Sequence, residues 1–176
     1  MEQTQQQSQQ QNELHSPSVN QEDVQQFLTF IMDEEEYGVD ILTVQEIRGW
    51  EEITAIPNAP VFVKGAINLR GTIVPIIDLR LRFGLTSVKY GPLTVIIVVK
   101  VELKVGSKIM GLVVDAVSDV YSIGQQQATD VPDISKSDNA EFVHGLVNVG
   151  EKMVVLLHLE RVLNLLQETE HDLLAG

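Results

Sequence analysis

The sequence contains no cysteine, so it has no disulfide bond, no thiolate nucleophile and no cysteine-bound zinc. Aromatic residues make up only 5% of the chain, which argues against a surface on which bases stack. Basic residues are scarce as well: 12 Lys and Arg stand against 25 Asp and Glu, for a formal net charge of −13. Phosphate backbones and anionic lipids repel such a chain, so we expect neither nucleic-acid binding nor direct membrane insertion.

Long apolar runs are also missing. None reaches the roughly 20 residues needed to span a bilayer, and the N-terminus lacks the basic-then-apolar layout of a signal peptide. Short runs of Val, Ile and Leu are abundant, and hydrophobic residues make up 44% of the 176 residues. This composition predicts a soluble cytoplasmic protein with one moderate domain or two small lobes that share a core.

The most informative stretch runs from Phe62 to Phe83 and predicts two strands joined at Arg70-Gly71. We call it the anchor hairpin. Gly71 suits a turn position with positive φ. Pro75 has no N–H for a ladder, which predicts an edge strand or a bulge. A single helical turn is expected over residues 79–83. The acidic run at residues 33–36 has no spaced-ligand pattern for a cation, so we expect a solvated hairpin tip there.

The anchor hairpin recurs 80 residues later, where Phe142, Val143 and Gly145 match Phe62, Val63 and Gly65. Upstream, residues 37–39 resemble residues 110–112 at an offset of 73. We therefore predict a mainly β protein with two copies of one small β unit, about 27–84 and 93–163, each a small barrel or sandwich. Short helices and a C-terminal helix over about 159–168 complete the expected domain of residues 24–168. Residues 1–23 and 169–176 are expected to be polar tails without structure.

Catalytic signatures are lacking. There is no G-x-S-x-G, no P-loop and no G-x-G-x-x-G, so we expect no enzyme activity and no cofactor. His144 and His158 fall in one hairpin, but a zinc site needs three or four convergent ligands, so no metal is expected either. The best candidate for a functional site is the pair Glu46 and Arg70, since Arg70 is the one charge at the turn of an apolar hairpin. Such a pair is either an ordinary surface ion pair or a device that orients Arg70 toward a partner.

Three stretches carry a resemblance to a known family: E-E-Y-G-V-D-I-L-T-V-Q-E-I-R-G at residues 35–49, F-V-K-G-A-I-N-L-R-G-T-I-V-P-I-I-D-L-R at 62–80, and G-L-V-V-D-A-V-S-D-V at 111–120. Together they are similar to CheW-like domains, the adaptor family of bacterial chemotaxis. The resemblance covers about residues 25–166. It implies two SH3-like five-stranded barrels around a shared core. It also implies a scaffold, monomeric on its own, that binds methyl-accepting chemoreceptors and the regulatory domain of the histidine kinase CheA at membrane-associated arrays.

The resemblance also assigns residues position by position. It places the charged pair Glu46 and Arg70 near the receptor site. Further positions associated with receptor binding or coupling are Val44, Ile47, Gly65, Val95, Ile96 and Gly111. Ile73 and Ile134 match kinase-facing positions, and Ile134 departs from the aromatic residue of close relatives. Two alternatives stay open: a scaffold of this family in another signalling pathway, or a double barrel that binds a small ligand through Asp78 or His158.

Overall fold

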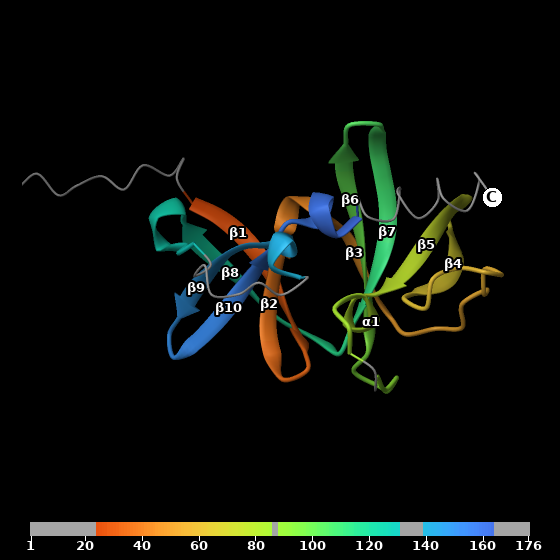
Figure 1. The fold of residues 1–176 in the computed structure, drawn as a ribbon, viewed down its shortest axis with the longest axis horizontal. Helices are drawn as coiled ribbons and strands as arrows, with labels where there is room; N and C mark the ends of the chain where they lie inside the picture. Colours follow the sequence, from red (N-terminus) through yellow and green to blue (C-terminus); the bar gives the residue numbers. More distant parts are fainter. Residues whose placement is uncertain (1–23, 86–87, 131–138, 164–176) are drawn as a thin grey trace, which may run out of the picture.

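The computed structural model describes residues 24–85, 88–130 and 139–163. They form two five-stranded sheets that lie side by side (Figure 1). The first sheet has the order β8-β1-β2-β10-β9 and the second the order β3-β6-β7-β5-β4. All neighbours are antiparallel except β2 with β10 and β5 with β7. The predicted fold class, mainly β with two five-stranded units, is confirmed.

Each sheet is curled and closed by one isolated bridge. In the second sheet the bridge joins Thr54, which follows β3, to Ala66 in β4 at the opposite edge. In the first sheet Thr129, which follows β8, bridges Leu146 in β9 in the same way. We call the first unit barrel A and the second barrel B. Barrel A consists of β1 (Val24–Met32), β2 (Glu35–Asp40), β8 (Ala116–Gly124), β9 (Val143–Val149) and β10 (Lys152–Leu157). Barrel B consists of β3 (Val44–Gly49), β4 (Val63–Leu69), β5 (Thr72–Asp78), β6 (Val95–Leu103) and β7 (Gly106–Val114).

The predicted subdomain boundaries, 27–84 and 93–163, are wrong as spatial units. Barrel A joins the first two strands of the first copy to the last three of the second, and barrel B makes the reverse combination. The repeat itself has a structural counterpart. Gly38 pairs with Leu156 in barrel A as Gly111 pairs with Ile76 in barrel B, in agreement with the two sequence offsets. The copies have therefore exchanged strands, which a sequence repeat cannot reveal.

The chain crosses between barrels through the 3-10 turn η2 (Ile41–Thr43) and through Asp115, between β7 and β8. Short helical turns fill the other connections: α1 (Leu79–Arg82), η3 (Gln125–Gln127) and η4 (Ala140–Phe142). Helix α1 confirms the expected turn after the anchor hairpin. Residues 159–163 are helical as expected, whereas residues 164–168 of the expected helix and both tails lie outside the described residues.

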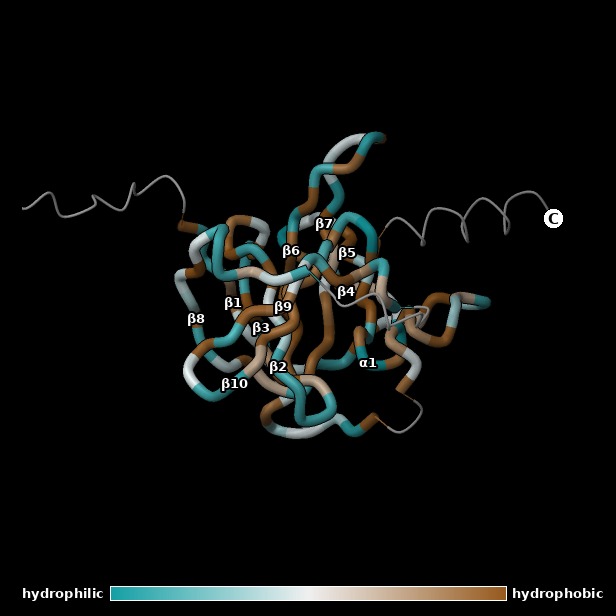
Figure 2. The backbone as a smooth tube through the Cα atoms, turned by 60° about the vertical axis from the view of Figure 1, so that its left-hand side comes forward, coloured by the Kyte–Doolittle hydropathy of each residue, from teal (hydrophilic) through white to brown (hydrophobic). Residues whose placement is uncertain are grey.

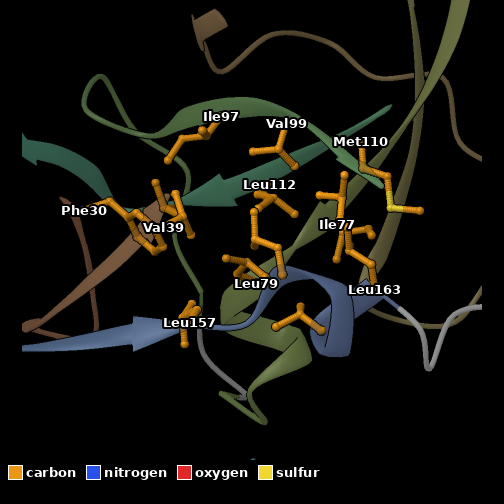
Figure 3. Close-up of a cluster of buried hydrophobic side chains, with 14 of the residues drawn as sticks. Phe30, Val39, Ile77, Leu79, Ile97, Val99, Met110, Leu112, Leu157 and Leu163 are labelled. Atoms are coloured by element: carbon orange, nitrogen blue, oxygen red, sulfur yellow. The ribbon is translucent and has the colours of Figure 1, made fainter. Parts of the chain in front are cut away.

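The largest core cluster joins the barrels (Figure 3). It combines β1 and β2 residues such as Phe30 and Val39 with barrel B residues such as Ile97 and Leu112, and Leu163 of the last helical turn covers it. Smaller clusters fill barrel B and barrel A separately. Much of the tube in the middle of the molecule is brown, that is apolar, in Figure 2, in agreement with β6, where residues 96–99 are all buried. We call the surface that borders this shared core, where the two barrels meet, the seam.

Two local expectations need correction. Strand β5 is not an edge strand, but it pairs with β7 only from Ile76 onward, so Pro75 faces no second ladder and its missing N–H costs nothing. The acidic run is not wholly solvated. Asp33 and Glu34 form the turn, both with positive φ, while Glu36 is buried in β2 and accepts a 2.8 Å hydrogen bond from Thr29 Oγ1.

Candidate functional site

The Glu46–Arg70 pair forms although its strands lie at opposite edges of the second sheet. Arg70 Nη2 is 2.9 Å from Glu46 Oε2, because closure of barrel B brings the β3 edge to the β4–β5 turn. Arg48 lies 3.0 Å from the other Glu46 oxygen and also binds Glu51. The hydrogen bond from Arg48 is the main cause that lowers the pKa of Glu46, and Arg70 adds to it. Arg48 was not among the predicted site residues, although its charge alternates with Glu46 along one strand.

Arg70 is held in an unusual conformation. It occupies the two-residue loop with Gly71, and both residues have positive φ, 51° and 86°, as a type I′ turn requires. The equivalent position in the second copy is Gly150, also with positive φ. A side chain with a Cβ resists this region of backbone space. The Arg70 side chain nevertheless remains 80% exposed, so its guanidinium is presented to solvent on a fixed turn, with Glu46 on one side of it.

The expected receptor residues separate into two faces of β3 and β6. Residues opposite each other in a ladder share a face. Val44 and Ile47 pair with Val99 and Ile97 of the shared core, so they lie on the seam side. Glu46 pairs with Val98 of the barrel B core, so it faces the other way.

Val95 packs against the shared core as well, so it belongs to the seam side with Val44 and Ile47. Ile47 is 45% exposed, whereas Val44 and Val95 are half-buried. The seam side is therefore apolar, and the Arg70 side is charged.

Three of the expected residues are buried in barrel B. Ile96 is fully buried, and Gly65 and Gly111 are buried too. A Cβ on Gly111 would lie 2.4 Å from Ile76 Cδ1, and one on Gly65 would lie 2.0 Å from the Thr54 carbonyl oxygen. The two glycines allow the close approach of the strands of barrel B, and none of the three positions presents an exposed side chain.

The seam has a second apolar edge that the resemblance did not assign. Val120 in β8 pairs with Leu28 of the shared core and is 42% exposed. Val117 packs against the same core. At the sequence offset of 73 between the copies, Val117 and Val120 correspond to Val44 and Ile47. This correspondence could have identified Val117 and Val120 as seam residues from the sequence. Ile73, the expected kinase contact, is 67% exposed on β5. Ile134 lies outside the described residues.

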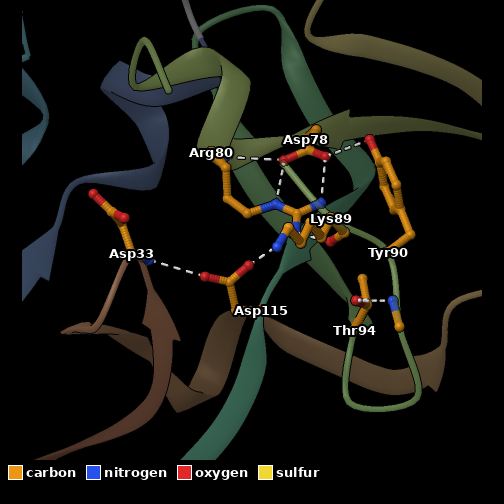
Figure 4. Close-up of polar contacts among 8 residues, drawn as sticks. Asp33, Asp78, Arg80, Lys89, Tyr90, Thr94 and Asp115 are labelled. Carbon is orange, nitrogen blue, oxygen red and sulfur yellow. Dashed lines mark hydrogen bonds and ion pairs between the residues drawn. The ribbon is translucent and has the colours of Figure 1, made fainter. Parts of the chain in front are cut away.

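Asp78, a suspect for a small-ligand site, is fully engaged by its neighbours (Figure 4). Its two oxygens accept hydrogen bonds from Arg80 Nε and Nη2 at 2.9 and 2.7 Å, and Tyr90 donates a third. Arg80 Nη1 reaches Asp115 at 2.8 Å, and Asp115 accepts a bond from the Asp33 amide. This network, buried at Asp78 and Arg80 and partly exposed at Asp115, fastens α1 in barrel B to the crossover and to the β1–β2 turn of barrel A. The carboxylates and the guanidinium of this network bind one another.

Two closed barrels around a shared core, with the charged turn at Arg70, are the arrangement that the sequence resemblance implied. A model of the CheW-like domain family matches residues 26–167. The chain belongs to the CheW-like domain family. Within the described residues, no helix is long and apolar enough to cross a membrane.

Several proteins of this family are similar to the chain along most of their length. The chemotaxis protein CheW of Klebsiella aerogenes is 46% identical over 140 residues, which cover 80% of this chain and 82% of that protein. A probable chemotaxis protein CheW of Rhizobium etli is 38% identical, covering 88% of this chain and 95% of its own. The crystal structure of the scaffolding protein CheW from Thermoanaerobacter tengcongensis superposes with a TM-score of 0.70 at 33% identity, covering 87% of this chain and 93% of that one.

Proposed function

We propose that this CheW-like protein is a non-catalytic adaptor that couples methyl-accepting chemoreceptors to the histidine kinase CheA, and that it is recruited from the cytoplasm to receptor arrays. Family membership and the chemotaxis names of its relatives support the class of function. The observation that carries the proposal is the Arg70 turn: an exposed guanidinium in a left-handed turn, ion-paired to Glu46 on β3, the strand whose other face borders the apolar seam. Backbone strain of this kind concentrates at functional positions.

The receptor tip docks along the seam. Ile47 and Val120 are partly exposed continuations of the shared core, from β3 in barrel B and β8 in barrel A. Apolar edges of this type accept the apolar stripe of a helix. Arg70 then supplies a fixed charge for a carboxylate or a helix C-terminus at the rim. Gly65, Ile96 and Gly111 contribute by holding β4, β6 and β7 beneath this surface.

The kinase docks on another surface of barrel B, around Ile73. This side chain is 67% exposed on β5, and an apolar side chain of this size contributes binding free energy when a partner removes it from water. Coupling requires that the two partners favour the same arrangement of the adaptor, because a partner shifts an equilibrium only by its differential affinity. The Arg80–Asp115–Asp33 contacts fasten the two barrels together and so transmit strain between these surfaces.

The test is capture of a purified receptor signalling fragment and of CheA by the full chain. Arg70→Ala should reduce receptor capture at least about tenfold without lowering the melting temperature by more than a few degrees, since an exposed ion pair contributes about 0–1 kcal/mol. Arg161→Ala is the matched control, because Arg161 is also exposed but lies in the last helical turn. Equal receptor capture by both variants would rule out the Arg70 site.

The kinase surface has its own matched pair. Ile73 and Met153 are equivalent in the two copies, and both are more than half exposed. Ile73→Ser should weaken capture of CheA, and Met153→Ser should leave it unchanged. Capture of neither CheA nor the receptor fragment by the wild-type chain would overturn the proposed function and favour a scaffold for another signalling pathway.

A further inference from the structure

Two histidines of barrel A are in contact beside the helical turn that covers the shared core. His144 lies near the start of β9, and His158 lies between β10 and helical residues 159–163. His144 Nδ1 and His158 Nε2 face each other at 3.1 Å and form a hydrogen bond. The rings meet edge to face, with their centroids 4.4 Å apart. The hydrogen bond therefore joins β9 to the residue from which the last helical turn starts.

The backbone of His158 holds the same connection. Its amide donates a 2.8 Å hydrogen bond to the Phe142 carbonyl, and its own carbonyl accepts bonds from the amides of Arg161 and Val162, both at 3.1 Å. The helical turn that begins there supplies three side chains to the shared core. A change in how His158 is held therefore reaches the side chains that close this core.

The contact between two imidazole rings depends on their protons. A neutral imidazole has one N–H and one bare nitrogen, so in the neutral pair one ring donates and the other accepts. A first added proton binds the outward nitrogen of the donor ring and leaves the hydrogen bond in place, now charge-assisted. A second proton can bind only the accepting nitrogen inside the contact. It turns that nitrogen into a donor, so two N–H groups then face each other and the hydrogen bond is lost.

The surroundings of the pair oppose the second proton. Burial is the main cause that lowers the pKa of His158, and His144 and Arg161 lower it further, while the exposed Glu160 acts in the opposite direction. Glu160 and Asp40 line an open cavity of about 140 Å³ together with both rings. The Asp40 oxygens already accept two hydrogen bonds. Within the described residues, no further charged side chain lines this cavity.

The first copy provides an internal comparison. At the offset of 80, His158 corresponds to Asp78, which is bound by Arg80 and Tyr90. An arginine stays charged at physiological pH, and burial raises the pKa of Tyr90 further above neutrality. The partners of Asp78 therefore keep their protons in the range where histidine titrates. The proton-sensitive contact belongs to the second copy.

We propose that the His144–His158 pair is a pH-sensitive contact, which holds helical residues 159–163 on the shared core at neutral pH and releases them when both rings are charged. The second proton binds the folded chain less readily than the unfolded chain. The contribution of the contact to stability is therefore complete above the ordinary His pKa of about 6.5 and is lost as pH falls through the lowered pKa of His158. The contact lies beside the η2 crossover, since Thr43 lines the same cavity. It does not depend on the proposed adaptor function.

The first test follows the histidine ring protons of the full chain by NMR between about pH 8 and pH 5, the range in which histidine titrates. We expect the pair to titrate in two separate steps, as coupled groups do, with the second step below the ordinary His pKa of about 6.5. His144→Phe keeps a ring in the edge-to-face contact but has no nitrogen, so His158 should then titrate in one step. The double variant His15→Ala/His171→Ala removes the other two histidines and is the matched control, which should titrate as the wild type does.

The second test measures the release itself by amide hydrogen exchange. The amides of Arg161 and Val162 donate to the His158 carbonyl, so their protection factors, corrected for the intrinsic pH dependence of exchange, report on the helical turn. Between neutral pH and about pH 5 these factors should fall about fivefold in the wild type, as for the loss of one hydrogen bond, and less than about twofold in His144→Phe. An equal fall in both proteins would overturn the proposal. If His144→Phe does not fold, the wild-type titration decides, since two independent single steps near the ordinary His pKa would also overturn it.

Discussion

Gly65→Ala offers the sharpest test of how barrel B closes. Gly65 has φ of +142°, and a Cβ there would lie 2.0 Å from the backbone oxygen of Thr54. That oxygen accepts the 2.9 Å bond from the Ala66 amide, which is half of the closing bridge. A side chain forced into this region of φ costs about 1–3 kcal/mol. Relief of the overlap by backbone movement costs about 1–3 kcal/mol more.

The unfolded chain offsets about 0.4–1 kcal/mol of this, because alanine has fewer unfolded conformations than glycine. The net loss should be about 3 kcal/mol, and the melting temperature should fall by roughly 6–12 °C for a chain of this length. Gly145→Ala is the matched control. It occupies the same place in barrel A, but its φ is not positive and the nearest atom to its Cβ, the Thr129 oxygen, would be 3.3 Å away.

We expect Gly145→Ala to change stability by less than about 1 kcal/mol. Urea denaturation monitored by the fluorescence of the single tryptophan, Trp50, measures both variants, since Trp50 stacks on Tyr90 in barrel B. Equal stability of the two variants would refute the closure argument. Loss of receptor capture by a Gly65→Ala protein of wild-type stability would instead place Gly65 in direct contact with the partner.

Three further predictions concern charged groups. Arg80→Met should lower the free energy of unfolding by about 3–5 kcal/mol, because it leaves the buried Asp78 carboxylate without its cation. Arg82→Met is the control, since Arg82 is half-buried and makes no ion pair in the described residues. It should lower the free energy of unfolding far less in the same urea experiment. Arg70→Gly should keep the fold at least as well as Arg70→Ala, because the turn needs positive φ; a lower melting temperature for the glycine variant would contradict this. Because the pKa of Glu46 is lowered, its ion pairs persist below the ordinary Glu pKa of about 4.3. Their contribution to stability is complete above that pH and is lost as pH falls through the lowered pKa. Carboxyl NMR should show the Glu46 titration midpoint rising more in Arg48→Gln than in Arg70→Ala, since Arg48 is the larger cause.

Local chemistry made much of this fold predictable. The two hairpins were evident because their turns, Arg70-Gly71 and Gly150-Glu151, lie between β-branched runs. The exchange of strands was not, because pairing of β1 with β8 joins residues about 90 positions apart and depends on how the crossovers run. The burial of Glu36 was missed for a similar reason: its partner Thr29 is fixed by register across the β1–β2 turn.

The charged residues of the candidate site were predictable from the sequence. Which of the apolar residues face a partner was not. The ion pair between Glu46 and Arg70 followed from two charges in apolar strands. Which neighbours point toward the seam follows from ladder register, and register placed Ile47 on the seam and Ile96 in the core of barrel B. The His144–His158 contact depends on a register shift in β10, and no sequence signal marks such a shift.

The strand exchange also sets the order in which the chain can fold during synthesis. Barrel B is built from one continuous segment, residues 44–114, and has all its strands once that segment has left the ribosome. Barrel A consists of the two ends of the domain, so the β1–β2 hairpin has no ladder partner other than itself until β8 and β10 emerge. That hairpin carries Phe30 and Val39, which belong to the shared core. Until then its apolar face has only barrel B to cover it, and a nascent chain halted before residue 116 therefore exposes an open sheet edge suited to pairing with another chain.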